Sequence, residues 1–308
     1  MCGISGIWSI NPNSKNLLRE VEEMAQIMKA RGPNNFGTWF DENENIALSH
    51  ARLSIIDLSE SGNQPMISQS ERYVMVFNGE IYNHKDLRNF IEKKTNFRKY
   101  WQGKSDSETL LAMIDIVGVK KTLDQIVGMF AFGVWDKYKK KLTLVRDRFG
   151  EKPLYWGWDN LNTRNSFFFA SDIAAFKALN TNFSINQRSL SEYLKKGYVP
   201  APYSIFNEIN QLLPGQLVEI NFSNKNYFDI KEYQWWDTFN QINNSRFKFS
   251  DEIEAITSLE EQLIKTINNQ SISDVPLGVF LSGGIDSTLI TALLQLQNKN
   301  PITTFTVA

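Results

Sequence analysis

The sequence predicts an α+β domain dominated by β-sheet, followed by the beginning of an α/β unit. Two observations support this prediction. Short strand-like segments separated by turn residues fill much of residues 1–183, which favours antiparallel pairing over βαβ units. Near the C-terminus, "VPLGVFLSGGIDSTLITALLQ" reads as a strand, a small-residue turn and a helix, and "ITTFTVA" reads as a second strand.

The composition narrows the class of protein further. The 308-residue chain is long enough for two domains, with 42% hydrophobic and 22% charged residues as in globular proteins. A net charge of −1 gives no electrostatic reason to expect nucleic acid or an anionic membrane as a partner. One cysteine and two histidines make a disulfide framework or a zinc site not credible, and they suit a reducing, cytoplasmic compartment. The longest apolar run, residues 126–135, is about half of the ~20 residues that a membrane helix needs.

The first predicted helix covers residues 16–30 and ends at "RGP". Strand-like segments follow, interrupted by a second helix at residues 105–118, where Ser105 and Glu108 have the spacing of a capping box. The apolar stripes of these helices are Leu17, Leu18, Val21, Met24, Ala25 and Met28, and Leu110, Leu111, Ile114 and Val117. The strand-like segments are residues 47–56, 73–83, 129–136, 141–147 and 166–171.

Residues 184–249 are predicted to be a linker that leads into a second domain. "KKGYVPAPYSIFNEINQLLPGQ" carries three prolines and two glycines, and "YFDIKEYQWWD" and "FNQINNSRF" continue this irregular character. Helical periodicity resumes at Asp251, with Ser250 as the expected cap, so residues 250–308 form the N-terminal part of the second domain. The apolar stripe of this helix is Ile253, Ile256, Leu259, Leu263, Ile264 and Ile267.

The last elements form one predicted βαβ unit. Leu277–Leu281 is the first strand, Ser282–Gly284 the turn, and residues 302–308 the second strand, with a helix between them. A lone βαβ unit cannot cover a parallel sheet. Either the chain is a fragment of a longer protein, or the missing strands come from elsewhere.

"MCGISGIWSI" places the sole cysteine at position 2. Once Met1 is removed, Cys2 carries a thiol and a free α-amine on one residue. A thiolate is a nucleophile with an ordinary pKa of about 8.5, and an α-amine of pKa about 7.7–8.0 is a suitable general base near neutral pH. The alternative is that Cys2 is a small apolar residue in a strand.

Nine segments together resemble one enzyme family. "MCGISGI", "RGP", "HARLSIIDL", "FNGEIYN", "SDSE" and "RDRFGEKPLYW" are similar to the glutaminase half of the glutamine-hydrolysing asparagine synthetases, which are class II amidotransferases. "GYVPAPYSIF", "LLPGQ" and "GVFLSGGIDSTL" continue the resemblance into the synthetase half, in the family's order. It implies an αββα N-terminal nucleophile fold for residues 1–183 and an incomplete α/β ATP-pyrophosphatase-type domain from residue 250.

The resemblance assigns Cys2 as the nucleophile and Asn78 and Gly79 as the oxyanion hole. From the residues alone, Asn78-Gly79 between two apolar runs is the commonest two-residue hairpin turn. A side-chain amide and a backbone N–H can also both point at the oxygen that becomes negative when a carboxamide is attacked. The turn and the oxyanion hole are therefore both open.

A free amino acid requires partners for its α-carboxylate and α-ammonium groups. Arg52 can fork two hydrogen bonds onto a carboxylate, and Asp106 and Glu80 offer charge opposite to an ammonium. The alternatives are a surface ion pair for Arg52 and a helix N-terminal position for Asp106. The resemblance favours the glutamine site, and it adds the backbone of Leu53, Ser54, Ile55 and Ile56 as the pocket lining.

The loop "SGGIDS" lacks the lysine of a Walker A motif. Small residues before a helix N-terminus still bind anions, and Asp286 could hold the Mg²⁺ that accompanies ATP. The alternative is an ordinary glycine-containing strand-to-helix turn. The resemblance makes this loop the pyrophosphate site, with Leu281, Ser282, Gly283, Gly284, Asp286 and Ser287 as ATP-binding residues.

Two positions depart from the family pattern. Asn34 stands where the family usually has aspartate, and Ala51 stands where an arginine commonly precedes Arg52, which we expect to loosen the pocket rim. His50 and His84 raise a competing mechanism, because a Cys–His dyad also activates a thiol. Nothing in their local sequence demands it, so we expect structural hydrogen bonds for both.

The resemblance implies that Cys2 hydrolyses glutamine, and that ATP activates aspartate as an acyl-adenylate which ammonia converts to asparagine. The expected partners are glutamine, aspartate, ATP and a second copy in a homodimer. As given, the chain is expected to hydrolyse glutamine without completing asparagine, because the family's synthetase domain continues beyond Ala308. Two alternatives stay open: amidation of another carboxylate, such as one on a surface sugar, and a non-catalytic glutamine- or nucleotide-binding regulator.

Overall fold

The computed structural model describes residues 1–10, 16–223, 227–244 and 249–307. By their internal contacts these residues form two units. The first unit comprises Met1–Ser54 and Ser59–Thr238, and the second comprises Ile55–Leu58 and Phe239–Ala308. Among the described residues, no helix has both the length and the apolar character that crossing a membrane requires.

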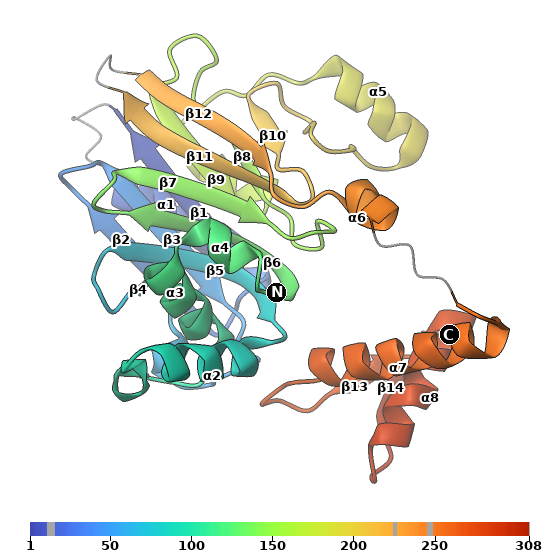
Figure 1. Ribbon diagram of the computed structural model, residues 1–308. Helices are drawn as coiled ribbons and strands as arrows, with labels where there is room; N and C mark the ends of the chain where they lie inside the picture. The colour runs from blue at the N-terminus through green and yellow to red at the C-terminus, as the bar shows by residue number, and fades with distance from the viewer. Residues whose placement is uncertain (11–15, 224–226, 245–248, 308) are drawn as a thin grey trace. The chain divides into compact units, whose positions relative to one another are not determined.

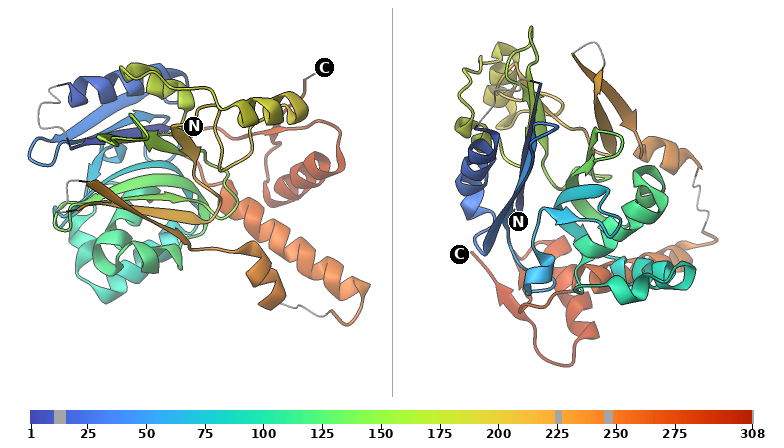
Figure 2. Two further views of the ribbon diagram at one scale, coloured as in Figure 1. Left: turned by 90° about the horizontal axis from the view of Figure 1, so that it is seen from above. Right: turned by 90° about the vertical axis from the view of Figure 1, so that its left-hand side faces the viewer.

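The first unit consists of two sheets packed face to face between two helical layers (Figures 1 and 2). In the described residues each sheet has six strands, and every pairing given for them is antiparallel. The αββα fold and the antiparallel pairing predicted from the sequence are thereby confirmed.

The order of sheet A is β10-β8-β9-β1-β3-β2, and that of sheet B is β12-β11-β7-β6-β5-β4. The strands of sheet A are β1 (Gly3–Ser9), β2 (Asn35–Asp41), β3 (Ile46–Arg52), β8 (Tyr155–Trp158), β9 (Ser166–Ala170) and β10 (Ile209–Gln211). The strands of sheet B are β4 (Met66–Ile67), β5 (Tyr73–Ile81), β6 (Gly128–Asp136), β7 (Lys141–Arg146), β11 (Gln216–Ser223) and β12 (Tyr227–Gln234).

Helices cover the outer face of each sheet. α1 (Leu17–Ile27), with η1 (Met28–Ala30) and η4 (Ile173–Ala178), packs on sheet A, and α2 (His84–Lys94), α3 (Asp106–Val117) and α4 (Val119–Leu123) pack on sheet B. The unit also contains η2 (Glu60–Gly62), η3 (Phe97–Tyr100) and α5 (Gln187–Lys196). Ser105 caps α3 as predicted, because its Oγ accepts the Glu108 N–H at 3.1 Å. Of the predicted α1 stripe, only Leu18 faces solvent, at 39% exposure.

Side chains alternate between the two faces of a strand, and this alternation places the functional residues. In β1, β3 and β5 the even-numbered apolar residues lie in the core between the sheets, whereas odd-numbered ones pack against the helices. The even-numbered core residues are Ile4, Trp8, Ile46, Leu48, Val74 and Val76. At one end of these strands the same inner faces continue with polar residues: Cys2, His50, Arg52, Asn78 and Glu80.

The predicted hairpin turn at Asn78-Gly79 is wrong. Both residues lie inside β5, opposite Ala131 and Phe130 of β6, and the pairing continues through Ile81. An Asn-Gly pair forms a hairpin turn when the strand ends there, and it stays extended when a neighbouring strand pairs with the residues on both sides of it. Here β6 pairs with the whole length of β5 and keeps the backbone extended.

The irregular character predicted for residues 227–237 is also wrong as far as Gln234. β11 and β12 pair along eight positions and complete sheet B, with Val218, Ile220 and Phe228 in the core between the sheets. In β11 the polar Glu219 and Asn221 alternate with those apolar residues, which is the period of a strand with one buried face. Residues 238–244 form helix α6 (Thr238–Asn244), and the rest of "FNQINNSRF" lies outside the described residues.

The second unit contains α7 (Glu252–Gln270), β13 (Gly278–Phe280), α8 (Ile285–Gln297) and β14 (Thr303–Phe305). β13 and β14 are parallel, which confirms the predicted βαβ order, although Ala308 lies outside the described residues. The expected cap Ser250 is wrong: Asp251 caps α7, its Oδ1 accepting the Glu254 N–H at 2.9 Å. Ser250 instead donates its N–H and its Oγ hydrogen to the Glu254 carboxylate, both at 2.6 Å.

Candidate active site

The Cys2 side chain lies at the start of β1 and is held by the backbone that follows β3. Its Sγ accepts the Leu53 N–H at 3.3 Å and donates to the Leu53 carbonyl oxygen at 3.6 Å. Arg31 Nε donates to the Cys2 carbonyl oxygen at 3.2 Å, which fixes the backbone at the other side. The thiol is thus partly buried and fixed in direction.

Burial and the neighbouring groups shift the pKa of the Cys2 thiol in opposite directions. Burial raises the pKa of the Cys2 thiol above its ordinary value, and the charge of Asp106 adds to the rise. The Leu53 N–H, the N-terminal ammonium and Arg52 act in the opposite direction. Because burial is the largest effect, the resting group is a thiol, and it needs a base before it can attack.

The N-terminal amine of the structure belongs to Met1, one residue before Cys2. The Met1 ammonium donates to the Arg31 carbonyl oxygen at 3.2 Å. Burial lowers the pKa of this amine, and the positive charges of Arg31 and Lys152 lower it further, against the opposing effect of Cys2. The surroundings therefore favour a neutral amine at this end of the chain, which is the form that accepts a proton.

Asn78 supplies a buried donor on the inner face of sheet B. Its side chain is 1% exposed, and its Nδ2 has no hydrogen-bond partner among the described residues. A buried amide N–H₂ without a partner costs folding free energy, so its presence points to a role with a ligand. The structure thus agrees with a polar site at this position, in a strand where the sequence suggested a turn.

Gly79 supplies a second donor, as the pairing register shows. Phe130, its partner on β6, directs its polar groups toward β7: its N–H donates to Asp147 Oδ2 at 3.2 Å, and its carbonyl accepts the Asp147 N–H at 2.8 Å. Gly79 must then direct its own N–H away from β6. On that side β4 pairs only with Val74 and Met75, so no strand among the described residues receives the Gly79 N–H. A Cβ at this position would meet the Met129 carbonyl oxygen at 2.2 Å, so only glycine fits.

Asp106 and Glu80 form the acidic side of the site. Asp106 begins α3, and its Oδ2 accepts the Ile81 N–H at 2.8 Å. Burial, together with the charge of Glu80, raises the pKa of Asp106 to about 7. Burial also raises the pKa of Glu80, although Lys152 opposes this rise. Two acids that resist ionisation would be stabilised as anions by an added cation such as an α-ammonium group.

Arg52 ends β3 on the inner face and is 6% exposed. Its Nη1 donates to the Ser59 carbonyl oxygen and to Asn63 Oδ1, both at 2.7 Å. It therefore orders the following loop as well as placing positive charge near Cys2. Arg52 is thus buried and does not have the surface position that the alternative interpretation assumed.

The predicted lining residues fall in two groups. Leu53 holds the thiol through its N–H. The Ser54 N–H donates to Asn34 Oδ1 at 3.0 Å. Asparagine in place of the family's aspartate therefore still provides the side-chain oxygen that accepts this backbone hydrogen bond. Ile55 and Ile56 are half-buried and belong to the segment grouped with the second unit. Ala51 is fully buried against the α1 side of sheet A, opposite the site, so the expected loosening of the pocket rim is wrong.

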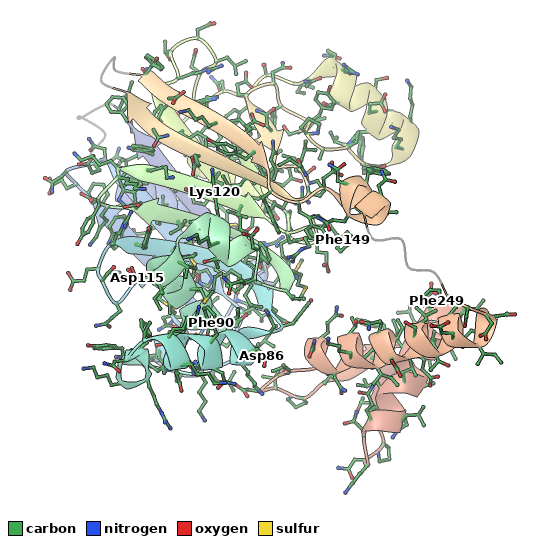
Figure 3. The ribbon with its side chains drawn as sticks, viewed as in Figure 1. Asp86, Phe90, Asp115, Lys120, Phe149 and Phe249 are labelled. Atoms are coloured by element: carbon green, nitrogen blue, oxygen red, sulfur yellow. The ribbon has the colours of Figure 1, made fainter. Side chains whose placement is uncertain are left out.

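Lys152 is a charged residue near the site that the sequence alone did not single out, although it lies in the segment "RDRFGEKPLYW". Lys152 is 7% exposed, burial lowers its pKa, and it makes no ion pair among the described residues. Its loop is organised by the Asp147 carboxylate, which accepts the backbone N–H groups of Phe149, Glu151 and Lys152 at 2.9–3.0 Å. Phe149, labelled in Figure 3, is an exposed residue of this loop, as is Glu151. Only these tertiary contacts direct the lysine toward Glu80 and the N-terminus.

The histidines do not form a dyad with the thiol. The hydrogen bonds of Cys2 Sγ among the described residues go to Leu53. His50 is 1% exposed, its Nε2 lies 3.2 Å from the Phe77 carbonyl oxygen, and burial lowers its pKa to about 3. His84 is buried at the start of α2.

The loop between β13 and α8 has the geometry of an anion site. Gly283 has φ +80°, a conformation that favours glycine, and Gly284 is the N-cap of the 13-residue α8. Ser287 Oγ accepts the Ser282 N–H at 3.3 Å, and the loop residues from Ser282 to Asp286 are exposed. Leu281 is anchored by β14, since its N–H donates to the Phe305 carbonyl at 2.8 Å.

These residues fit a polyphosphate, because exposed N–H groups and hydroxyls surround a helix N-terminus. The loop offers few protein ligands for a metal ion. Among the described residues, no group of three or more His, Cys, Asp or Glu side chains could hold one. Asp286 would therefore be a single carboxylate ligand for Mg²⁺, with phosphate oxygens and water completing the shell, as is usual for this ion.

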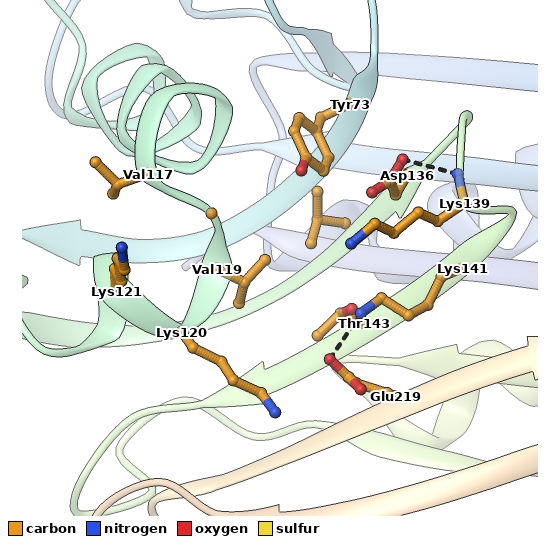
Figure 4. A pocket seen from close by; sticks show the side chains of 12 residues that line it. Tyr73, Val117, Val119, Lys120, Lys121, Asp136, Lys139, Lys141, Thr143 and Glu219 are labelled. Atoms are coloured by element: carbon orange, nitrogen blue, oxygen red, sulfur yellow. Dashed lines mark hydrogen bonds and ion pairs between the residues drawn. The ribbon is translucent and has the colours of Figure 1, made fainter.

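A separate hollow of about 470 Å³ lies on the outer side of sheet B, between α4 and strands β5, β6, β7 and β11 (Figure 4). Its two carboxylates are already paired, Asp136 with Arg72 at 2.6 Å and Glu219 with Lys141 at 2.7 Å. It contains none of the predicted site residues. The inner-face polar cluster is therefore the better candidate for chemistry.

The two facing sheets between helical layers form the fold of a glutamine amidotransferase domain. Residues 1–236 match the glutamine amidotransferase domain family, and residues 258–308 match the asparagine synthase family. The chain belongs to the glutamine amidotransferase domain family and continues into the beginning of an asparagine synthase domain.

Its curated relatives carry the corresponding names. Asparagine synthetase 1 of Bacillus subtilis is 32% identical over 96% of this chain and 44% of the relative, and asparagine synthetase B of Escherichia coli is 30% identical over 96% and 45%. Amidase chry2 of Gibberella zeae is 28% identical over 96% and 43%. The chain spans about half the length of the curated relatives it matches.

A solved structure supports the fold. The glutamine phosphoribosylpyrophosphate amidotransferase of Bacillus subtilis, complexed with ADP and GMP, superposes with a TM-score of 0.55 at 16% identity. The superposition covers 99% of this chain and 65% of that one. At this identity the similarity concerns the fold alone.

Proposed function

We propose that this protein hydrolyses glutamine with Cys2 as an N-terminal nucleophile after removal of Met1. The observation that carries the proposal is a fixed thiol in one sheet and, in the facing sheet, two donors without a partner among the described residues: Asn78 Nδ2 on the inner face and the Gly79 N–H at the edge of β5. This is the arrangement that attack on a carboxamide requires.

The chemistry follows from these positions. The α-amine of Cys2 takes the thiol proton, and Sγ forms a bond to the amide carbon of glutamine. Asn78 and Gly79 donate to the oxygen that becomes negative. The amine returns the proton to the leaving nitrogen, ammonia departs, and water hydrolyses the thioester to glutamate with regeneration of the thiol.

The ends of the substrate have matching partners. Arg52 would bind the α-carboxylate, and Asp106 with Glu80 would bind the α-ammonium, beside the backbone of residues 53–56. The raised pKa values of the two acids support this assignment, because a bound cation would relieve the cost of ionising them.

For the whole protein we propose glutamine-dependent asparagine synthesis, with aspartate and ATP as the other substrates and a homodimer as the assembly. The asparagine synthetase names of its relatives and the match at residues 258–308 support this assignment. Residues 281–284, Asp286 and Ser287 would hold the ATP pyrophosphate and its Mg²⁺. ATP would activate the aspartate β-carboxylate as an acyl-adenylate with release of pyrophosphate, and ammonia would then attack the acyl carbon and displace AMP. The second candidate is amidation of a carboxylate other than that of aspartate, since one relative is named an amidase and not an asparagine synthetase.

The test compares the wild-type chain with Cys2→Ser and with a variant whose N-terminal extension cannot be removed. Glutamate formation from glutamine is measured by NMR, and mass spectrometry establishes whether Met1 is absent from active protein. We expect both variants to lose turnover by about 10³-fold or more. Unchanged turnover in Cys2→Ser, or active protein that retains Met1, contradicts the proposal. Glutamine binding without ammonia release in wild type would instead favour the regulator.

A further inference from the structure

Two buried side chains hold the backbone of Phe77, the residue before Asn78. The Phe77 N–H donates to Gln64 Oε1 at 2.6 Å, and the His50 Nε2 lies 3.2 Å from the Phe77 carbonyl oxygen. β4 pairs with β5 only at Val74 and Met75, so both groups lie beyond the end of their neighbouring strand. His50 and Gln64 therefore take the place of a strand partner at this edge.

The bonding fixes the tautomer of His50. A carbonyl oxygen only accepts, so Nε2 must carry the proton. Burial lowers the pKa of His50 to about 3, so near neutral pH the ring is uncharged and has a single N–H. Nδ1 is then an acceptor, and it has no partner among the described residues. A neutral ring committed to a carbonyl is suited to hold the backbone and unsuited to accept the thiol proton.

The edge of β5 shows why this matters for the site. Phe77, Gly79 and Ile81 direct their polar groups to the same side, because such groups alternate along a strand. Phe77 is held by His50 and Gln64, and Ile81 is held by Asp106 Oδ2 at 2.8 Å. Gly79 lies between these two anchored residues with its N–H unused. The direction of that N–H, and of the Asn78 side chain, is set by the anchors on either side.

We infer that His50 and Gln64 are positioning residues for the oxyanion donors Asn78 and Gly79, an inference that rests on the proposed glutamine hydrolysis. Oxyanion donors act only if they are fixed before the charge develops, and a shift of about 1 Å can cost on the order of 10²-fold in rate. Among the described residues the hydrogen bonds of the thiol go to Leu53 and not to His50 or Gln64, so their loss should lower kcat without changing the nucleophile.

The experiment uses the full chain and a matched pair of variants. His50→Gln keeps an N–H donor at a reach similar to that of Nε2, whereas His50→Leu removes it. We expect His50→Leu to lower kcat for glutamine by about 10- to 100-fold with little change in KM, and His50→Gln to stay close to wild type. A glutamate γ-semialdehyde inhibitor, whose adduct with Cys2 carries an oxyanion, should lose affinity in parallel with kcat.

A reactivity measurement separates positioning from damage to the nucleophile. Alkylation of Cys2 by iodoacetamide needs the thiol and its base but no oxyanion donor, so its rate should be unchanged in His50→Leu. Loss of alkylation along with kcat, equal kcat in His50→Leu and wild type, or equal losses in the two His50 variants would each overturn the inference.

Gln64 provides a second test that remains if His50→Leu does not fold. Gln64→Met removes the acceptor for the Phe77 N–H while keeping the length of the side chain, and Gln69→Met changes an exposed glutamine nearby. We expect only Gln64→Met to lower kcat, and equal kcat in both would contradict the inference. Wild-type turnover that depends on Cys2 is established first, so a failure of the proposed function is seen separately.

Discussion

Helices α3 and α7 carry similar apolar stripes, yet the two units bury them differently. In α3, Leu110, Leu111 and Ile114 are at most 2% exposed, because sheet B and α2 cover them. In α7, Ile253, Ile256 and Leu259 are 76%, 56% and 59% exposed, and only the end near Ile267 packs on α8. A stripe shows which face of a helix is apolar, but it does not show what covers that face.

The sheets of the two units also differ in how much of their surface is buried. β5 and β6 pair inside a sheet that is covered on both faces, whereas β13 and β14 form a parallel pair with Phe280 78% exposed. Parallel strands normally occur with both faces covered. Consequently the first unit offers fixed, buried polar groups for chemistry, and the second offers an exposed loop whose donors are open to solvent.

The sharpest test of this comparison is to separate the units. We expect residues 1–238 to unfold cooperatively and residues 239–308 to show no cooperative transition. The reason is that the buried core of the second unit consists of Ile267, Leu293 and Leu294 among the described residues, too little to offset chain entropy. Circular dichroism during urea unfolding measures both, with residues 1–308 as the reference. A cooperative transition in the isolated 239–308 segment would contradict the comparison.

The next largest effect is expected at Asn78. Asn78→Ala removes a buried donor from the inner face, so kcat for glutamine should fall by about 10²–10³-fold with a small change in KM. Asn221→Ala, a half-buried asparagine on β11, serves as the matched control and should leave kcat unchanged. Steady-state kinetics decide it, and a loss below about tenfold would show that Asn78 is not an oxyanion donor.

Asp106 should make glutamine binding depend on pH. Its pKa is raised to about 7, so the carboxyl is mostly neutral at pH 6 and mostly charged at pH 8, and only the charged form pairs with an ammonium. In a Cys2→Ala background, glutamine affinity should rise about tenfold from pH 6 to pH 8. Calorimetry measures this affinity, and adding Asp106→Asn should make it weak and nearly independent of pH. A pH-dependence that persists in Asp106→Asn would assign it to another group.

The smallest effect is expected at the α7 cap. Asp251→Ala removes the acceptor for the Glu254 N–H, which should destabilise the start of α7 by about 1 kcal/mol and speed amide exchange there about fivefold. Glu261→Ala, on the exposed face of the same helix, is the control. Glutamine hydrolysis should not change. Exchange that accelerates in the first unit as well would show that the two units are not independent.

Local patterns predicted much of this molecule. The caps, the helix periodicity, most strands and the glycine-rich turn before α8 depend on neighbouring residues, and the structure shows them with few changes. Two errors had one cause. Asn78-Gly79 read as a turn, although β6 holds it extended. Residues 227–234 read as irregular, although they pair with β11, which itself pairs with the distant strand β7.

The supporting residues of the site could not be predicted in this way. His50 and Gln64 meet Phe77 across 27 and 13 residues, and Lys152 reaches Glu80 through a loop ordered by Asp147. A histidine in a strand or a lysine in a loop has many ordinary roles, and no local spacing distinguishes these. Their roles depend on which faces of which strands come together.

By itself the sequence determined the type of most segments, the position of its one cysteine at residue 2 and the class of chemistry its motifs resemble, because these depend on residue identity and short spacing. Only the tertiary structure decided that Asn78 lies within β5, that its sheet packs against the sheet that contains β1, and that buried side chains hold the backbone of Phe77 beside it. Packing of distant strands removes water from these polar groups, and that burial shifts their pKa values and fixes their direction.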